Sequence, residues 1–205
     1  MLDHLVYATP NLALTVADLE ARLGVRAAPG GRHPGRGTRN ALIALSEIAY
    51  LEIIGPDPGQ TDCRSPRWFG IDALETPRVV AWAAKAADIE AVAARASAGG
   101  VALGPVGDGS RQREDGTWLR WRYTDPATVV GDGLVPFLIE WGASAHPAAS
   151  APRGVTLASF RADHVDPDRI RPMLAALDLS VMVERGPEPA LIATLDTPRG
   201  RIELR

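Results

Sequence analysis

The sequence predicts an α+β protein in which repeated βαβββ modules form a curved mixed sheet, a half-barrel with helices on the outside. Three observations indicate this fold. A strand–helix–strand pattern occurs three times along the 205 residues. A capping residue precedes each predicted helix. Each copy closes with a strand that carries a glutamate, namely Glu52, Glu140 or Glu203. The period of about 60–75 residues is too long for a usual solenoid, and it suits modules that pair to bury their sheets.

The pattern divides the chain into a first module at residues 1–56, a second at 78–142 that pairs with the first, and a third at 154–205. Residues 56–77 and 143–153 are rich in proline and polar groups, which is typical of linkers.

In the first module we expect a strand over residues 2–8 and a helix that begins after Asn11. Apolar residues then fall on one helical face, and Gly24 follows where a left-handed C-cap belongs; the face consists of Leu12, Val16, Leu19 and Leu23. Two strands should follow, near 41–45 and 49–54.

The second module should open with a strand at 78–83, continue with a helix capped by Asp88, and close with strands near 117–124 and 134–141. The third should open at 154–161 and continue with a helix that has Asp166 as its cap and Pro167 at its first position. Strands near 180–184, 190–195 and 200–204 would complete it.

Composition excludes several classes of function. The net charge of −3 gives no signal for nucleic acid. No stretch approaches the roughly 20 apolar residues of a membrane span. The single cysteine, Cys63, cannot form an internal disulfide, which suits a reducing compartment. We therefore expect a cytoplasmic protein with a small-molecule substrate, and the sequence leaves a homodimer open.

Three residues in predicted strands could bind a metal: His4, Glu52 and Glu140. A carboxylate inside an apolar strand needs a partner, because burying an unpaired charge is costly. Imidazole and carboxylate together suit Zn, Ni, Fe, Co or Mn, and three ligands leave positions open for water and substrate. The alternative is a hydrogen-bonded core histidine and glutamates at solvated strand edges.

A glycine-rich segment, residues 30–40, could bind a ligand. Its glycines let backbone N–H groups approach closely, and Arg32, Arg36 and Arg39 could pair with a carboxylate or phosphate. We predict that Arg32, His33 and Asn40 line the mouth of a cleft. His33 would be an acid or base, Glu140 a catalytic carboxylate, and Trp121 an aromatic wall. The alternative is an exposed connecting loop.

The chain resembles the vicinal oxygen chelate superfamily, specifically its glyoxalase-like branch. The repeated modules, the closing strands and the segment 30–40 followed by Tyr50-Leu51-Glu52 carry this resemblance. It implies that metal ligands come from the first and last strands of two paired modules, at His4, Glu52 and Glu140. One departure matters, because Val79-Val80-Ala81-Trp82 lacks the histidine that would supply a fourth ligand. That leaves a three-ligand site, a site completed by His33 or His146, or a lost site.

The resemblance implies a metal-dependent enzyme that acts on a small oxygenated metabolite, with lyase or isomerase chemistry through an enediolate or oxyanion. Two alternatives stay open. One is a metal-free binding or resistance protein of the same fold. The other is a 2-His-1-carboxylate oxygenase in which a second histidine joins His4 and Glu140. We expect the third module to complete the fold without building a second site.

Overall fold

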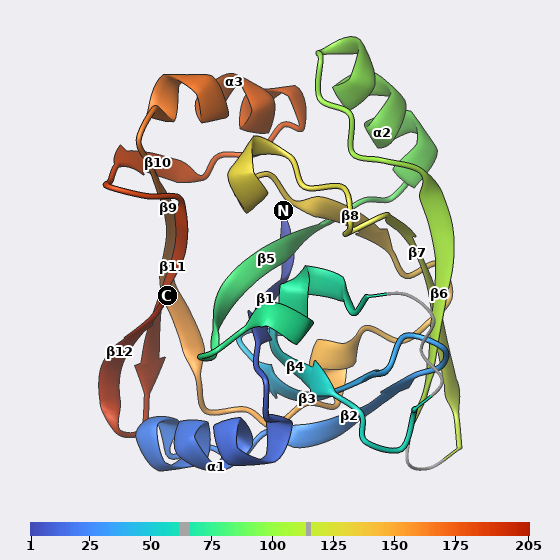
Figure 1. Cartoon of the computed structure of the whole chain (residues 1–205), viewed down its shortest axis with the longest axis vertical. Helices are drawn as coiled ribbons and strands as arrows, with labels where there is room; N and C mark the ends of the chain where they lie inside the picture. The colour runs from blue at the N-terminus through green and yellow to red at the C-terminus, as the bar shows by residue number, and fades with distance from the viewer. Residues whose placement is uncertain (62–65, 114–115) are drawn as a thin grey trace.

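The computed structural model describes residues 1–61, 66–113 and 116–205. Its main feature is a closed barrel with the strand order β1-β4-β3-β2-β6-β7-β8-β5 (Figure 1). The strands are β1 (Leu2–Ala8), β2 (Ala28–His33), β3 (Thr38–Ala44), β4 (Tyr50–Pro56), β5 (Arg78–Lys85), β6 (Val106–Gln112), β7 (Trp118–Thr124) and β8 (Phe137–Glu140).

The predicted α+β class is confirmed, but the expected half-barrel is wrong, because the sheet closes. Two seams join its halves. β1 pairs antiparallel with β5, and β2 meets β6 through one pair, Arg32 with Gln112. Neither β2, which begins the glycine-rich segment, nor β6 was predicted as a strand, and Val-Gly-Asp-Gly-Ser-Arg-Gln of β6 lacks apolar alternation. Without β6, the second half has no strand to reach β2, and the sheet stays open.

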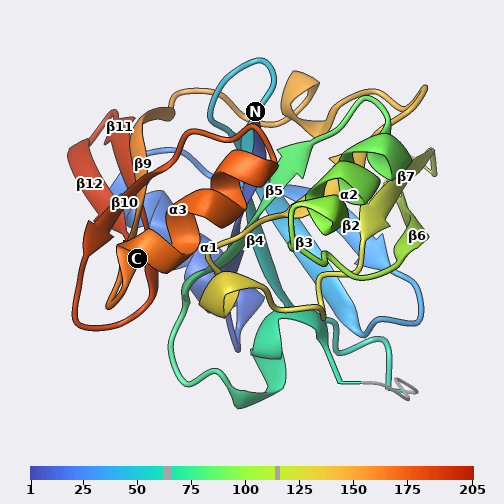
Figure 2. The ribbon, with the colours of Figure 1, turned by 90° about the horizontal axis from the view of Figure 1, so that it is seen from above.

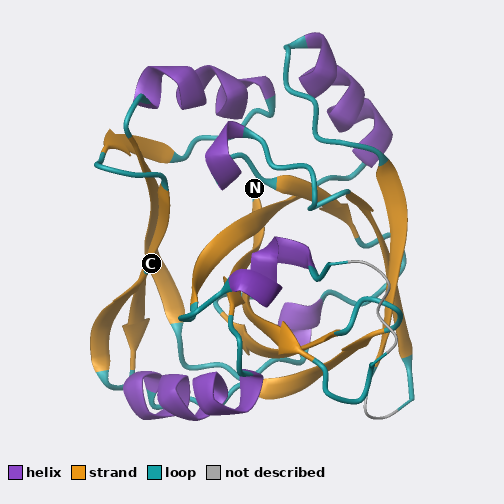
Figure 3. Ribbon diagram, in the orientation of Figure 1, coloured by secondary structure: helices purple, strands orange, loops and turns teal. Residues whose placement is uncertain are grey.

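Three helices of the described chain lie outside the strands (Figure 3). They are α1 (Leu12–Leu23), α2 (Ile89–Ala98) and α3 (Pro167–Ala176). The Asn11 side chain accepts from the Leu14 amide, and the Asp88 side chain accepts from the Ala91 amide. Gly24 has φ +75°, a left-handed conformation that favours glycine. These caps agree with the sequence predictions.

Residues 156–204 form a separate sheet in the order β10-β9-β11-β12, beside the barrel (Figures 1 and 2). Its strands are β9 (Thr156–His164), β10 (Met182–Arg185), β11 (Ala190–Thr197) and β12 (Gly200–Leu204). It packs on β5, where the rings of Phe160 and Trp82 lie 5.2 Å apart and the Val79 amide donates to the Arg205 carbonyl. The large apolar core therefore lies between the barrel's outer face, α1 and this sheet.

Two short 3-10 segments lie at opposite ends of the barrel, η1 (Trp68–Ala73) and η3 (Pro147–Ala149) (Figure 2). In the view of Figure 1, η1 crosses the centre of the barrel. Trp68 and Phe69 of η1 line the cavity inside the barrel. In the part of the chain that the structure describes, no helix is long and apolar enough to span a membrane.

Candidate functional site

The barrel interior contains a cavity of about 40 Å³. Alternation along the strands aims every second side chain inward. These are His4 in β1, Tyr50, Glu52 and Ile54 in β4, and Phe137 and Ile139 in β8. A volume of this size holds a few water molecules, so it accepts only a small ligand or the end of a longer one.

Asp3 fixes the orientation of His4. The fully buried Asp3 carboxylate accepts from Nδ1 of His4 (2.8 Å), Nε2 of His146 (3.1 Å) and Nε1 of Trp141 (3.0 Å). Burial alone would raise the pKa of Asp3, but the hydrogen bonds from His146 and His4 lower it to about 2. With Nδ1 held by a carboxylate, Nε2 of His4 faces the cavity.

Glu52 is the buried carboxylate of the cavity. Asn40 Nδ2 donates to its Oε1 (2.5 Å). Its Oε2 lies 3.7 Å from Nε2 of His4, and its Oε1 lies 3.9 Å from Nε2 of His33. One carboxylate is therefore flanked by two imidazoles and held by an amide.

His33 is buried in a neutral form. Its Nδ1 lies 2.9 Å from the Thr38 hydroxyl, and its Nε2 lies 3.4 Å from Asn40 Nδ2. Burial lowers the pKa of His33 to about 4, and the positive charges of Arg111 and Arg36 act in the same direction while Glu52 opposes them. At neutral pH this side chain therefore supports Asn40 and Glu52 as a neutral ring.

Aromatic rings complete the cavity wall. Tyr50 stacks on His4 at 4.7 Å, and Trp121 packs against Trp141 at 5.3 Å. Burial, together with the negative charges of Asp3 and Glu52, raises the pKa of Tyr50 well above its usual value.

At one end of the cavity, Trp68 and Phe69 of η1 close the mouth. Arg36 lies 4.3 Å above the Trp68 ring and donates to the Tyr123 hydroxyl (2.9 Å). A side chain of the glycine-rich segment thus secures the covering of the cavity.

The prediction that His4, Glu52 and Glu140 converge is wrong for Glu140. Its Oε2 accepts from the Ile89 amide (2.9 Å) at the start of α2, outside the barrel. The inward positions around it are Phe137, Ile139 and Trp141. Glu140 shares a face with Leu138, as expected, but this face packs outward. The assigned catalytic and metal-binding roles of Glu140 therefore have no structural basis.

The structure also leaves Arg32 out of the cavity. Its guanidinium pairs with both oxygens of Asp57, at 2.6 and 3.1 Å, and is more than half exposed on the barrel's outside. Its neighbour His33 points inward, so the strand alternation separates the two. His33, Asn40 and Trp121 line the cavity. Cys63 lies outside the described residues.

The donor set does not fit the expected divalent transition metal (Zn, Ni, Fe, Co or Mn). Among the described residues, no group of three or more His, Cys, Asp or Glu side chains could hold one ion. His4 and Glu52 supply two donors, and Nε2 of His33 is engaged by Asn40. The Arg111 guanidinium in the same cavity also repels a dication.

Several polar and aromatic residues of the site were not predicted from the sequence: Asp3, Tyr50, Trp68, Phe69, Arg111, Phe137 and Trp141. Tyr50 could have been found, because it shares the inward face with Glu52. Arg111 gave no signal, because the polar, glycine-rich β6 does not resemble a strand.

Comparisons with known proteins show the family to which this chain belongs. The model of the glyoxalase-like domain family matches residues 2–177. No curated protein matches. A solved hypothetical protein from Staphylococcus aureus superposes with a TM-score of 0.64 at 15% identity, covering 98% of this chain and 83% of that one. At this identity, the similarity shows the fold alone.

Two methylmalonyl-CoA epimerases are more distant in structure. A Streptomyces coelicolor variant in complex with 2-nitronate-propionyl-CoA has 24% identity and a TM-score of 0.46, covering 69% of this chain and 97% of that one. The Mycobacterium tuberculosis enzyme has 19% identity and a TM-score of 0.44, covering 69% and 87%.

Proposed function

Because this chain belongs to the glyoxalase-like domain family, we propose that it is an enzyme that moves a proton at the carbon next to a carbonyl group of a small oxygenated compound. Glu52 would be the base. The observation that carries this proposal is the buried Glu52 carboxylate, held by Asn40 and flanked by His4 and His33 inside the cavity. Burial and neighbouring groups of this kind are how proteins prepare a carboxylate for proton transfer.

The chain's own side chains define the steps. Glu52 takes the proton from carbon, the C–H electron pair forms a C=C bond, and the carbonyl oxygen becomes an oxyanion. Return of the proton to either carbon gives an isomer or epimer, and loss of a β-substituent gives a lyase product. His4, oriented by Asp3, lies 3.7 Å from Glu52 and would exchange a proton with the oxygen.

Deuterium exchange tests the proposal. Proton NMR in D₂O would follow the CH groups of pyruvate, 2-oxobutyrate, hydroxyacetone and lactaldehyde. We expect the wild type to exchange at least one of them, and Glu52→Gln to lose about 10²–10⁴ in rate. Glu140→Gln is the matched control, because the same change falls outside the cavity, and it should keep the wild-type rate. Equal exchange by wild type and Glu52→Gln would refute the role of Glu52.

The metal-dependent form of the enzyme is tested in the same experiment. A chelated sample and samples given Zn, Ni, Fe, Co or Mn salts should exchange at the same rate, because no group of three His, Cys, Asp or Glu side chains among the described residues could hold the ion. A rate that requires one of these ions, together with stoichiometric binding of that ion that His4→Ala abolishes, would restore the metal-dependent assignment.

The second candidate is a metal-free binding or resistance protein of the same fold. The aromatic wall favours it, because Tyr50, Trp121 and Trp141 offer stacking surfaces that need no chemistry. Saturable ligand binding without exchange of any ligand CH group would select this candidate. The oxygenase alternative loses its basis, because Glu140 lies outside the cavity.

A further inference from the structure

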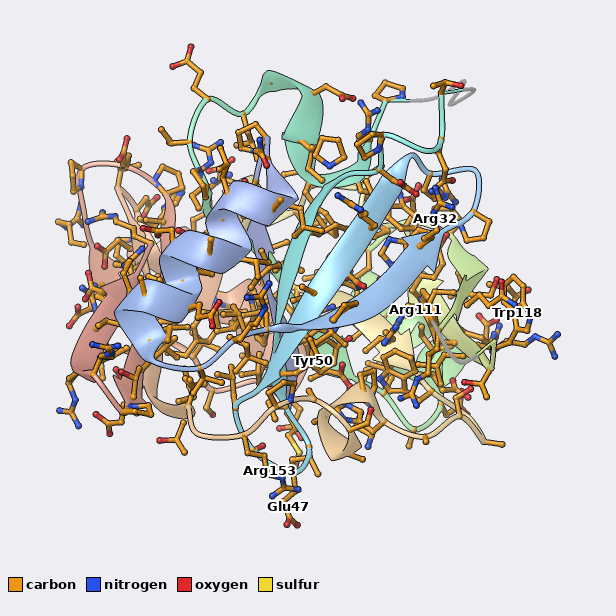
Figure 4. The ribbon with its side chains drawn as sticks, turned by 90° about the horizontal axis from the view of Figure 1, so that it is seen from below. Arg32, Glu47, Tyr50, Arg111, Trp118 and Arg153 are labelled. Atoms are coloured by element: carbon orange, nitrogen blue, oxygen red, sulfur yellow. The ribbon has the colours of Figure 1, made fainter. Side chains whose placement is uncertain are left out.

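Arg111 is a buried cation inside the barrel. It lies on β6 opposite Leu119 of β7 and is only 3% exposed. Figure 4 shows Arg111 beneath the β2–β3 hairpin, within the outline of the ribbon, whereas Trp118 projects from it. The Arg111 side chain lines the same cavity as Tyr50 and Glu52.

One nitrogen of the guanidinium lacks a hydrogen-bond partner among the described residues. Its Nη1 atom is buried, and no hydrogen bond satisfies it within the described chain. The described ion pairs of Glu52 are with the two imidazoles and not with Arg111. Burial lowers the pKa of Arg111, against the opposing charges of Tyr50 and Glu52. An arginine stays protonated even so, and a buried unpaired charge is costly unless a ligand neutralises it.

Gly31, which has no side chain, leaves space beside the Arg111 guanidinium. A Cβ atom on Gly31 would lie 3.2 Å from Nη1 of Arg111 and 2.5 Å from the Gln112 carbonyl oxygen, and Gly31 has φ +148°. A larger residue would therefore push β2 away from β6 at the one pair that joins them. A second hollow of about 230 Å³ reaches Arg111 from the other side, between Gly30, Arg113 and Ser150. Arg111 thus stands between the inner cavity and this hollow.

We propose that Arg111 binds the carboxylate of the substrate, so that the substrate class is a short 2-oxo or 2-hydroxy carboxylate. This assignment rests on the proposed function for its reacting carbon, which would face Glu52. A guanidinium binds a carboxylate through two parallel N–H···O bonds. The cavity of about 40 Å³ favours this planar three-atom group over a tetrahedral phosphate ester. Glu52 stays on the far side of the ligand, where it meets the carbon.

Calorimetric titration in low-salt buffer tests the proposal with pyruvate and lactate as probes. Their neutral amides, pyruvamide and lactamide, have the same shape without the charge. We expect the wild type to bind the acids at least tenfold more tightly than the amides. Arg111→Met should abolish this preference, and Arg111→Lys should weaken it. Arg32→Met is the matched control, because that arginine is exposed on the barrel's outside, and it should keep the preference within twofold.

Thermal unfolding separates ligand binding from a structural role. Without ligand, Arg111→Met should melt at or above the wild-type temperature, because it removes an unpaired buried charge. Pyruvate should then raise the melting temperature of the wild type and not that of the variant. A large loss of melting temperature in unliganded Arg111→Met, equal binding of acid and amide, or binding of inorganic phosphate alone would overturn the assignment.

The two proposals can fail separately. If Glu52→Gln and the wild type both bind pyruvate through Arg111 while neither exchanges its protons, the enzyme proposal fails and the carboxylate site stands. If the wild type exchanges protons and Arg111→Met keeps its KM, the carboxylate site fails and the enzyme proposal stands.

Discussion

Acid should destabilise this protein through His33, because the buried imidazole resists protonation in the folded chain. Above about pH 6.5 the imidazole is neutral in the folded and the unfolded chain. As the pH falls towards 4, only the unfolded chain takes up the proton, because the folded pKa of His33 is lowered from 6.5 to about 4. Stability is thus present above the unfolded pKa and is lost as the pH falls through this window. The full loss is about 3 kcal/mol, and about 2 kcal/mol is already lost at pH 5.

Urea unfolding of the wild type and His33→Gln at pH 7, 6 and 5 measures this loss. The neutral glutamine does not titrate, so the variant should lose about 2 kcal/mol less than the wild type between pH 7 and 5. The pKa of Asp3, about 2, places its effect at lower pH, outside this window. His4, His146 and His164 are common to both proteins and cancel in the difference. Equal losses in the two proteins, or an NMR titration of His33 centred near 6.5, would refute the reasoning.

Three further predictions follow from individual contacts. Glu140→Ala should lower the free energy of unfolding by about 1 kcal/mol, measured in urea, because the Ile89 amide loses its acceptor; a variant that also loses ligand binding would contradict this outward placement. Asp3→Asn should lose less free energy of unfolding than the wild type between about pH 3.8 and 2, followed by circular dichroism in urea, because the pKa of Asp3 is lowered to about 2 only in the folded chain and the asparagine does not titrate; equal losses in the two proteins would exclude a contribution of Asp3. A chain ending at Pro152 should fail to give a cooperative thermal transition, because Trp82 loses its contact with Phe160 and the barrel loses the four-stranded sheet β10-β9-β11-β12; a cooperative truncated chain would show that this sheet is dispensable.

The helices could be predicted because their signals are local. Asn11 and Asp88 each bond an amide three residues on, and Gly24 takes the left-handed conformation that its position required. Pro167 also begins α3 as expected, although the predicted cap, Asp166, makes no side-chain hydrogen bond. Such contacts depend on a few neighbouring residues, so the sequence pattern contains them.

Closure of the barrel and the composition of the site could not be predicted in this way. β6 has no apolar alternation, and it is held by its ladder to β7 and a single pair to β2. Arg111, the cation of the cavity, lies on this strand. Its position depends on a contact between residues about 80 apart in sequence, for which no local pattern exists.

The error at Glu140 shows why a matching motif did not give a matching site. Glu52 and Glu140 each stand between apolar residues in a closing strand. The side chain of Glu52 nevertheless points into the barrel, whereas that of Glu140 points to its outer face. A shift of one residue moves a side chain from one face of a sheet to the other. In β4 the inward residues are Tyr50 and Glu52, whereas in β8 they are Phe137 and Ile139.

Because of this difference, the two halves of the barrel supply different kinds of side chain to the cavity. The first half supplies the acid–base groups His4 and Glu52, from β1 and β4, and the Asn40 amide of β3 that holds Glu52. The second half supplies apolar walls from β7 and β8, and one cation, Arg111, from β6. A ligand between the halves would therefore meet a base on one side and a positive charge with aromatic rings on the other. This asymmetry is what a carboxylate substrate requires, since its charged end and its reacting carbon need opposite partners.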